Sequence, residues 1–313
     1  MKENTTKIES FFNELDRVIT GQQDLKRDIL ICLLSGGHIL LEGAPGLAKT
    51  LTVNTVAKIM GMSFQRIQFT PDLLPSDLIG AKIYDPGSKK FDVKKWPIFA
   101  NFVLADEINR APSKVQSALL EAMEEKQVTI GEESFQLDTP FMVLATQNPI
   151  EQEGTFHLPE AQLDRFLMKT IIEYPTKSEE IEIMKNHHLI TWKKIQRIFS
   201  KKDIFEIQKS IQEVQVSETI YEYIRDIVFF TRESAILKKY LSYGASPRAS
   251  LGILRAAKTL AYIDWRDFVL PEDIKHVSYG VLRHRIILSY EALAENITPD
   301  MIIKKVLENV EVK

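Results

Sequence analysis

The sequence has a single cysteine, no long hydrophobic run and no signal-like N-terminus. Cys32 has no second cysteine for an intramolecular disulfide and lies in an apolar run, where a small buried side chain is expected. No stretch approaches the ~18 apolar residues that a membrane-spanning helix needs, and Met1–Asp16 lacks the apolar centre of a secretory signal. These absences predict a protein without a membrane span that works in the cytoplasm.

An excess of charge of either sign is also absent. Forty Lys and Arg residues stand against 43 Asp and Glu residues, which leaves a net charge of −3. This balance provides no general electrostatic surface for nucleic acid, so nucleic-acid binding is not expected. The hydrophobic share of 44% beside a charged share of 27% excludes a disordered chain. A length of 313 residues predicts two domains, or one large domain with an appendage.

Short apolar runs alternate with helical patterns up to about Pro175. Nearly continuous apolar runs are typical of strands covered on both faces, so they predict a parallel sheet in a layered α/β domain. Beyond residue 176 the helical patterns continue alone. We therefore expect an α/β domain over residues 1–176 and an all-α domain over residues 177–313. The five apolar runs are His38–Glu42, Ser63–Phe69, Phe102–Ala105, Phe141–Thr146 and Lys169–Tyr174.

Residues 43–50, Gly-Ala-Pro-Gly-Leu-Ala-Lys-Thr, follow the first apolar run and precede a helical pattern. They match the phosphate-binding loop except that Ala48 stands at the second required glycine. A strand before the loop and a helix after it bring backbone N–H groups and the positive helix end to one point, which suits a polyphosphate. Lys49 would contact the terminal phosphates, and the Thr50 hydroxyl would bind Mg²⁺. Ala48 is compatible with the loop if its φ is negative, since it would then lie in the first helical turn. A plain Gly-Pro turn into a helix is the alternative.

Two carboxylates, Asp106 and Glu107, end the apolar run Phe102–Ala105. Ligands of open α/β sheets collect at such strand ends. If this strand lies beside the one that feeds the loop, Asp106 would hold Mg²⁺ and Glu107 would act as general base on the attacking water. A turn or a helix cap is the alternative. Asn148 follows a further strand, where its amide could orient that water, although Asn before Pro also starts ordinary turns.

These residues, in this order, resemble the AAA+ ATPases, and several strings narrow the resemblance to the MoxR family. The resemblance runs from about Val18 to beyond Arg248 and so covers most of the chain. The strings are LEGAPGLAKT at 41–50, LADEINRAP at 104–112, QSALLEAM at 116–123, ATQNP at 145–149, LPEAQLDRF at 158–166 and GASPRA at 244–249.

The resemblance implies a P-loop NTPase of AAA+ type, with a parallel-sheet core and a C-terminal helical lid, that hydrolyses ATP with Mg²⁺ in a ring, expected to be a hexamer. It makes Asn148 the first sensor, Arg165 the arginine finger that reaches the adjacent subunit, and Arg248 the second sensor on the lid. Taken singly, each arginine is more simply a surface ion pair. The implied metal ligands are Thr50 and Asp106, and the implied Walker B pair is Asp106 and Glu107. The implied nucleotide-binding residues are Val18, Ile19 and Gly21 on the adenine side and Gly43, Ala44, Pro45, Gly46, Leu47, Ala48, Lys49, Thr50 and Leu51 in the Walker A loop.

Two segments resemble the insertions of this family. The first, the helix-2 insert at about 70–97, contains a predicted hairpin, and the second is a hairpin before the first sensor at about 127–137. Both are expected to face the axis of the ring. Lys89, Lys90, Lys94 and Lys95 could grip an acidic or nucleic ligand, although a solvated edge strand is the simpler interpretation.

The resemblance also implies a function: chaperone-like remodelling or maturation of a protein complex, with a protein client such as one that bears a von Willebrand factor A domain. A DNA-associated AAA+ motor is one alternative, and the net charge of −3 speaks against it. A nucleotide-gated scaffold that does not hydrolyse ATP is another. The presence of Glu107, Asn148 and Arg165 together weighs against it, since a binding module needs neither a base nor a finger.

Overall fold

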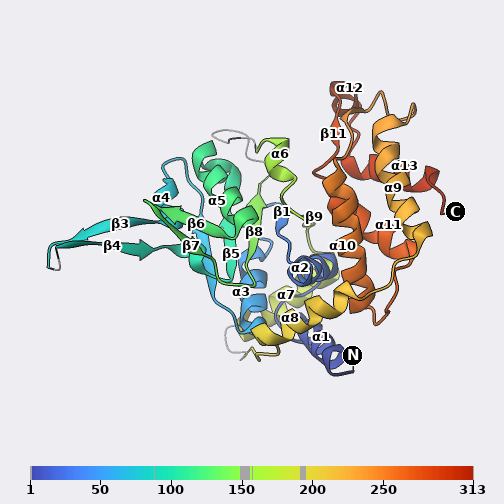
Figure 1. Ribbon diagram of the computed structural model, residues 1–313. Coiled ribbons are helices and arrows are strands. Elements are labelled where there is room, and N and C mark those ends of the chain that lie inside the picture. The colour runs from blue at the N-terminus through green and yellow to red at the C-terminus, as the bar shows by residue number, and fades with distance from the viewer. Residues whose placement is uncertain (1, 88, 149–155, 157, 191–194, 313) are drawn as a thin grey trace.

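The protein has a layered α/β part and a helical part that lie side by side, with two hairpins projecting from the far side of the α/β part (Figure 1). The computed structural model describes residues 2–87, 89–148, 156, 158–190 and 195–312. Among these residues no helix has both the length and the apolar character to span a membrane.

A parallel five-stranded sheet forms the centre of the α/β part, in the order β2-β5-β8-β1-β9. All five predicted strands are confirmed. Coverage on both faces holds for β1, β5 and β8, whose residues are buried except at their carboxyl ends. It is wrong for the two edge strands, because β2 exposes most of its side chains and β9 buries only alternate residues. The strands are β1 (Ile39–Glu42), β2 (Phe64–Gln68), β5 (Phe102–Asp106), β8 (Met142–Gln147) and β9 (Met168–Ile171).

Successive residues of the central strands point to opposite faces of the sheet, as the pleat requires. Leu41 of β1 packs on the face that carries α2 (Gln23–Leu34) and α3 (Lys49–Met60). Leu40 packs on the opposite face, in a second cluster that includes α5 (Ser113–Glu125). The sheet is therefore held between helices on both sides, and its carboxyl edge stays free for a site.

Both predicted hairpins are present, and both project from the same side of the molecule (Figure 1). The first follows α4 (Pro75–Ile79) and pairs β3 (Gly80–Asp85) with β4 (Lys90–Lys95). The second pairs β6 (Gln127–Ile130) with β7 (Glu133–Gln136). Lys94 lies 4.8 Å from the centre of the Trp96 ring, and Lys95 lies 4.9 Å from the rings of Phe99 and Phe135. That these hairpins face the axis of a ring stays a prediction.

The second half of the chain is mainly helical, as predicted, with one correction. A short antiparallel pair, β10 (Leu241–Tyr243) with β11 (Ile287–Leu288), lies among the helices. These strands are too short to show a periodic pattern in the sequence. Ser or Thr side chains cap the N-termini of α8, α9, α10, α12 and α13. The helices of this half are α7 (Lys177–Ile190), α8 (Lys201–Gln212), α9 (Glu218–Glu233), α10 (Pro247–Ile263), α11 (Pro271–Leu282), α12 (Tyr290–Ala294) and α13 (Pro299–Asn309).

The remaining helices of the first half are α1 (Lys2–Asp16), α6 (Glu160–Leu163) and two 3₁₀ helices, Pro97–Phe99 and Ile108–Arg110.

The larger hydrophobic cluster crosses between the two parts of the molecule. It joins residues of α1, α2, α3 and the sheet to residues of α8, α9, α10, α11 and α13. The division at residue 176 therefore stays a prediction, since packing is continuous on either side of it. Cys32 lies in this cluster with none of its surface exposed, and burial raises the pKa of its thiol well above the ordinary value. The expectation of a small buried side chain is confirmed.

Candidate active site

A cavity of about 420 Å³ lies at the carboxyl edge of the sheet. It brings together the phosphate-loop pattern, the acidic pair and the amide at the third strand tip. The residues that line it are Pro45, Gly46, Leu47, Ala48, Lys49, Thr50, Leu51, Arg66, Asp106, Glu107, Thr146 and Asn148.

The loop reaches this cavity through a tight turn between β1 and α3. Gly43 lies so close to the segment after β9 that a Cβ atom there would come within 2.9 Å of the Ile172 carbonyl oxygen. Lys49 donates a hydrogen bond of 2.6 Å from Nζ to the Gly43 carbonyl. Burial lowers the pKa of Lys49, while the nearby carboxylates of Asp106 and Glu107 act against this. The Lys49 ammonium group thus lies near the carboxylates of Asp106 and Glu107, at the N-terminus of α3.

Ala48 does not have the negative φ that would place it in the first helical turn. Its φ is +54°, and α3 begins only at Lys49. The turn into α3 needs left-handed backbone just before the helix, which explains why the usual pattern has glycine there. A non-glycine residue in this region costs roughly 1–2 kcal/mol.

The strand that ends in Asp106 does not lie directly beside the strand that precedes the loop, because β8 lies between β5 and β1. Thr146, at the end of β8, connects the two carboxylate residues. Its Oγ1 donates to Asp106 Oδ1 at 2.6 Å and accepts the Glu107 backbone N–H at 2.8 Å. Glu107 has a φ of +56°, a strained conformation of the kind that clusters at functional sites.

Three further side chains hold the carboxylates, and the sequence alone did not indicate them. Arg66 Nη2 lies 2.6 Å from Asp106 Oδ2, and Gln68 Nε2 donates to Glu107 Oε2 at 2.8 Å. Arg110 Nε lies 3.3 Å from the same oxygen of Glu107. The parallel register pairs Gln68 of β2 with Asp106 of β5, which places Arg66 and Gln68 beside the acids. The sequence signal for these two residues was their polar character within the strand-like run Ser63–Phe69.

The chemistry of the donors fits Mg²⁺. A threonine hydroxyl and an aspartate carboxylate, Thr50 and Asp106, are hard oxygen ligands of the kind that Mg²⁺ prefers. Within the described part of the chain, His, Cys, Asp and Glu form no group of three or more that could hold a metal by themselves. Mg²⁺ would therefore need phosphate oxygens and water as its remaining ligands, which is its usual mode of binding in nucleotide sites.

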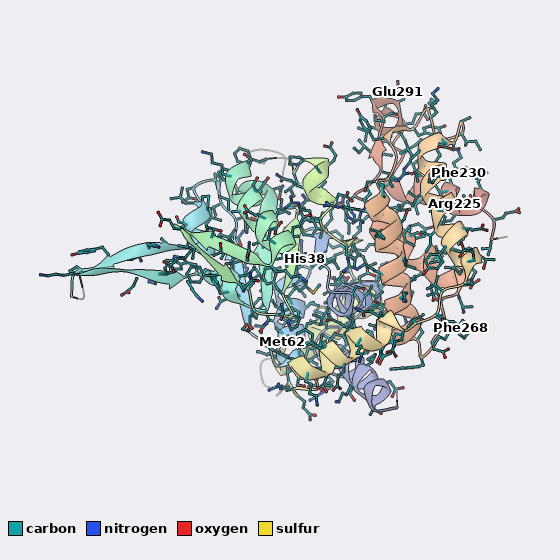
Figure 2. The ribbon with its side chains drawn as sticks, in the orientation of Figure 1. His38, Met62, Arg225, Phe230, Phe268 and Glu291 are labelled. Atoms are coloured by element: carbon teal, nitrogen blue, oxygen red, sulfur yellow. The ribbon has the colours of Figure 1, made fainter. Side chains whose placement is uncertain are left out.

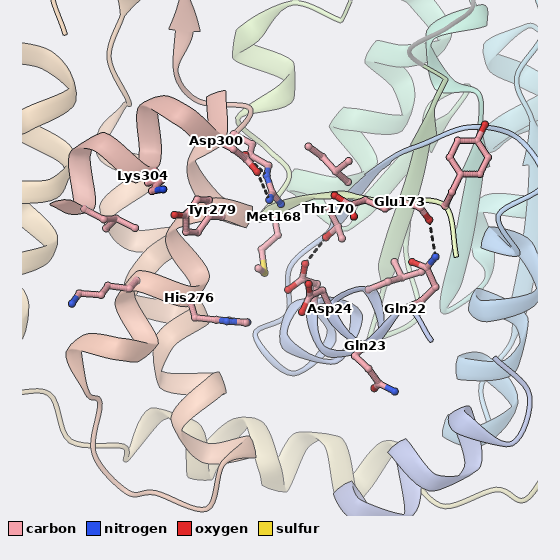
Figure 3. Close-up of a pocket in the computed structure, with 18 of the residues that line it drawn as sticks. Gln22, Gln23, Asp24, Met168, Thr170, Glu173, His276, Tyr279, Asp300 and Lys304 are labelled. Atoms are coloured by element: carbon pink, nitrogen blue, oxygen red, sulfur yellow. Dashed lines mark hydrogen bonds and ion pairs between the residues drawn. The ribbon is translucent and has the colours of Figure 1, made fainter. Parts of the chain in front are cut away.

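The residues predicted for the adenine side are not among those that line this cavity. Val18 and Ile19 have 6% and 3% of their surface exposed, so their side chains belong to the core. Gly21 lies against the Glu179 carboxylate. Next to it, Gln22 Nε2 donates to the Glu173 carbonyl at 2.9 Å, at the wall of a larger cleft of about 830 Å³ between α2, β9, α11 and α13 (Figure 3).

The two predicted arginines meet elsewhere. Arg165 Nε and Arg248 Nη2 lie 3.1 Å and 2.9 Å from the two carboxylate oxygens of Glu124, on α5. Both arginines line a separate cavity of about 290 Å³ between α5 and α10. Neither is among the described residues that line the loop cavity. The structure brings the two arginines together, and it does not bring them to the loop of the same chain.

The chain matches two family models. Residues 38–168 match the ATPase family associated with various cellular activities, and residues 233–306 match an AAA lid domain. The loop, the acidic pair, Asn148 and Arg165 lie within the first match, and Arg248 lies within the second.

Similar proteins cover almost the whole chain. Chaperone MoxR1 of Mycobacterium tuberculosis is 48% identical over 97% of this chain and 81% of its own length. Protein YeaC of Bacillus subtilis is 43% identical over 95% of this chain and 92% of its own. A crystal structure of a Cytophaga hutchinsonii protein that is named as a proposed ATPase superposes with a TM-score of 0.93 at 52% identity, over 99% of this chain and 96% of its own. Together with the parallel P-loop core, these matches mean that the chain belongs to the MoxR family of AAA+ ATPases.

Proposed function

We propose that this chain hydrolyses ATP with Mg²⁺ in a homo-oligomeric ring, expected to be a hexamer. One observation carries the proposal. Lys49, Asp106 and Glu107 line a single cavity, whereas Arg165 and Arg248 lie together in a different one. A nucleotide in the loop cavity thus has a phosphate cradle and a base from its own chain, and its arginines would come from a second chain.

The residues of the cavity have distinct roles in this proposal. Lys49 and the loop N–H groups would hold the terminal phosphates, and Glu107 would accept a proton from the attacking water while Asn148 orients it. Thr50 and Asp106 would hold Mg²⁺, which would supply positive charge to offset the charge of the phosphates. Gln68 and Arg110 hold the Oε2 atom of Glu107, so the proton would go to its Oε1 atom.

The arginines are free enough to change partners. The side chains of Arg165, Arg248 and Glu124 are 31%, 49% and 40% exposed. Ion pairs with this much exposure are worth at most about 1 kcal/mol. The triphosphate of an adjacent subunit carries more charge than one carboxylate, so it would attract both guanidinium groups away from Glu124. A finger of this kind is worth on the order of 10³–10⁵ in turnover.

The coupling of hydrolysis to a client is the least direct part of the proposal. Its support is the name of a relative, chaperone MoxR1, which covers 97% of this chain. We therefore propose remodelling or maturation of a protein complex, with a von Willebrand factor A domain protein as one candidate client. The cytoplasmic location stays a prediction from the sequence. Stimulation of turnover by DNA would favour the alternative of a DNA motor.

Subunit mixing tests the shared site. Glu107→Gln and Arg165→Ala should each bind ATP and lose turnover, and mixing the two should restore activity at interfaces that combine an intact base with an intact finger. Arg225→Ala is the matched control, since this exposed arginine pairs with Asp226 on α9, within the helical part and away from the sheet (Figure 2). Lys49→Ala should lose ATP binding, and mixing it with Glu107→Gln should restore no activity, because both changes lie in the same cavity.

Two results would oppose this proposal. Absence of rescue at every mixing ratio would mean that Arg165 does not complete a neighbour's site. Equal and negligible turnover in the wild type and Glu107→Gln, with ATP binding intact in both, would favour the non-hydrolysing scaffold.

A further inference from the structure

We propose that Arg285 is the positioning residue of the arginine finger: it holds the segment that carries Arg165, so that the finger moves with the lid of its own subunit. This inference rests on the proposed role of Arg165 and deepens it. Arg285 follows α11 in the lid, and the segment it holds, residues 164–167, belongs to the α/β part.

The contacts of Arg285 use its whole guanidinium group. Nε donates to the Asp164 carboxylate at 2.6 Å, and Nη2 donates to the carbonyls of Asp164 at 3.1 Å and Phe166 at 2.6 Å. Nη1 donates to the carbonyls of Leu167 at 3.0 Å and Val281 at 2.5 Å. A guanidinium has five N–H donors, so each has an acceptor. Four of these five bonds go to the finger segment.

Arg285 is also well enclosed. Its side chain is 3% exposed and that of Asp164 is 18% exposed, so both are largely removed from water. The carbonyls of Phe166 and Leu167 are buried and that of Asp164 is partly buried, and buried carbonyls need donors. One planar guanidinium group supplies a donor to all three. Lysine, with three donors and no fixed geometry, cannot reproduce this arrangement. Arginine at position 285 therefore fixes the backbone around the finger in a way that lysine could not.

Other lid residues hold the same segment from the same side. His284 Nε2 lies 2.9 Å from the Phe166 carbonyl oxygen, and Ser246, the N-cap of α10, donates from Oγ to Asp164 at 2.9 Å. On the opposite side, the Leu167 N–H donates to the His38 carbonyl at 2.8 Å, at the start of β1. The finger segment is therefore clamped between the lid and the sheet.

Arg165 follows directly after Asp164, and its own contacts are weaker and more exposed. It donates from Nη1 to the Leu120 carbonyl at 2.7 Å and pairs with Glu124. A shift of the lid that keeps the Arg285 contacts must carry Asp164, and with it the root of the Arg165 side chain. Misplacement of a catalytic group by about 1 Å can cost on the order of 10²-fold in rate. Arg285 thus sets the position from which Arg165 acts on the adjacent subunit.

Arg285→Lys tests this proposal, with Arg266→Lys as matched control. Arg266 is a partly buried lid arginine whose partner, Asp273, lies within the lid. For Arg285→Lys we expect turnover to fall on the order of 10²-fold while the KM for ATP stays within about threefold, because its own nucleotide cavity is intact. Arg266→Lys should lower thermal stability without this loss of turnover.

Two further measurements separate positioning from damage to the fold. The double variant Arg165→Ala/Arg285→Lys should turn over no more slowly than Arg165→Ala, because Arg285 acts through the finger. Mixing Arg285→Lys with Glu107→Gln should restore activity, as it should for Arg165→Ala. If Arg285→Lys does not fold, Asp164→Asn weakens the same contact from the other side and should give the same pattern to a smaller degree.

The results can oppose this inference without opposing the shared site. Rescue of Arg165→Ala but not of Arg285→Lys by Glu107→Gln would overturn the role of Arg285 and leave the finger in place. A double variant slower than Arg165→Ala by the full effect of Arg285→Lys would do the same. Failure of Arg165→Ala to be rescued would remove the finger, and the role of Arg285 with it.

Discussion

The replacement Asp28→Asn should stabilise this protein at alkaline pH and lose that advantage as the pH falls. Asp28 lies on α2 in the wall of the large cleft, is 6% exposed, and accepts a hydrogen bond of 2.6 Å from Thr170 Oγ1 on β9. Burial is the main reason that the pKa of Asp28 is raised from its ordinary value of 3.8 to about 7, and the nearby charge of Asp24 adds to the effect. Thr170 and Arg283 act in the opposite direction.

The sign and the size follow from the two pKa values. The folded chain keeps its proton on Asp28 at pH values where the unfolded chain has lost it, so stability falls as the pH rises from about 3.8 to about 7. The two values differ by about three pH units, each worth about 1.4 kcal/mol, so ionised Asp28 costs about 4 kcal/mol above pH 7. Asparagine has the shape of the protonated acid and cannot ionise. Asp28→Asn should remove this cost.

Urea unfolding at pH 8.0 and pH 5.5 is the appropriate assay. The advantage of Asp28→Asn over the wild type should approach about 4 kcal/mol at pH 8.0 and shrink by about 2 kcal/mol at pH 5.5. Glu218→Gln is the control, since Glu218 is exposed in the first turn of α9 and is not among the groups that shift the pKa of Asp28; it should change stability by no more than about 1 kcal/mol at either pH. Parallel pH curves for Asp28→Asn and the wild type would refute the account of Asp28.

Three smaller perturbations have defined outcomes. Ala48→Gly should stabilise the fold by about 0.5–1 kcal/mol in urea unfolding, because glycine adopts a φ of +54° without strain but loses more entropy on folding. Burial lowers the pKa of His38 from 6.5 to about 4, so between these pH values the unfolded chain is protonated at His38 and the folded chain is not, and stability falls as the pH falls. From pH 7 to pH 4 the free energy of unfolding of the wild type should therefore drop by about 3 kcal/mol more than that of His38→Phe. Gln68→Ala should change ATP turnover, measured by phosphate release, by no more than about fivefold, because Arg110 still pairs with the same Glu107 oxygen and one hydrogen bond contributes about 1 kcal/mol.

His38 also illustrates where the sequence is silent about chemistry. It begins the first apolar run and lies toward the middle of the molecule (Figure 2). Its Nδ1 accepts the Val143 N–H at 3.0 Å, and its Nε2 lies 3.2 Å from the Met123 carbonyl oxygen. The ring is therefore neutral and bridges strand β8 and helix α5. Neither partner is near it in the sequence, so no spacing rule could have indicated this role.

The strands, the hairpins and the loop were predictable because their signals are local. Apolar runs, turn residues and a glycine-bearing loop before a helix each lie within about ten residues. The partners of the acidic pair were not predictable, since they depend on sheet order. Gln68 meets Glu107 only because β2 pairs with β5, and Thr146 meets Asp106 only because β8 lies between β5 and β1. The left-handed Ala48 required the course of the backbone itself.

Several contacts tie the lid to the α/β part around the finger, and two of them differ clearly in strength. The Glu124 connection to Arg248 is exposed and weak, whereas Arg285 is buried and uses all of its donors. In the proposed ring, ATP in the adjacent subunit would draw Arg165 and Arg248 from Glu124 and so release the weak connection alone. Arg285 would still bind Asp164, one residue from the finger. The lid would then be freer to move, and its movement would be passed through Arg285 to Arg165. In this way the lid of one subunit could control hydrolysis in its neighbour.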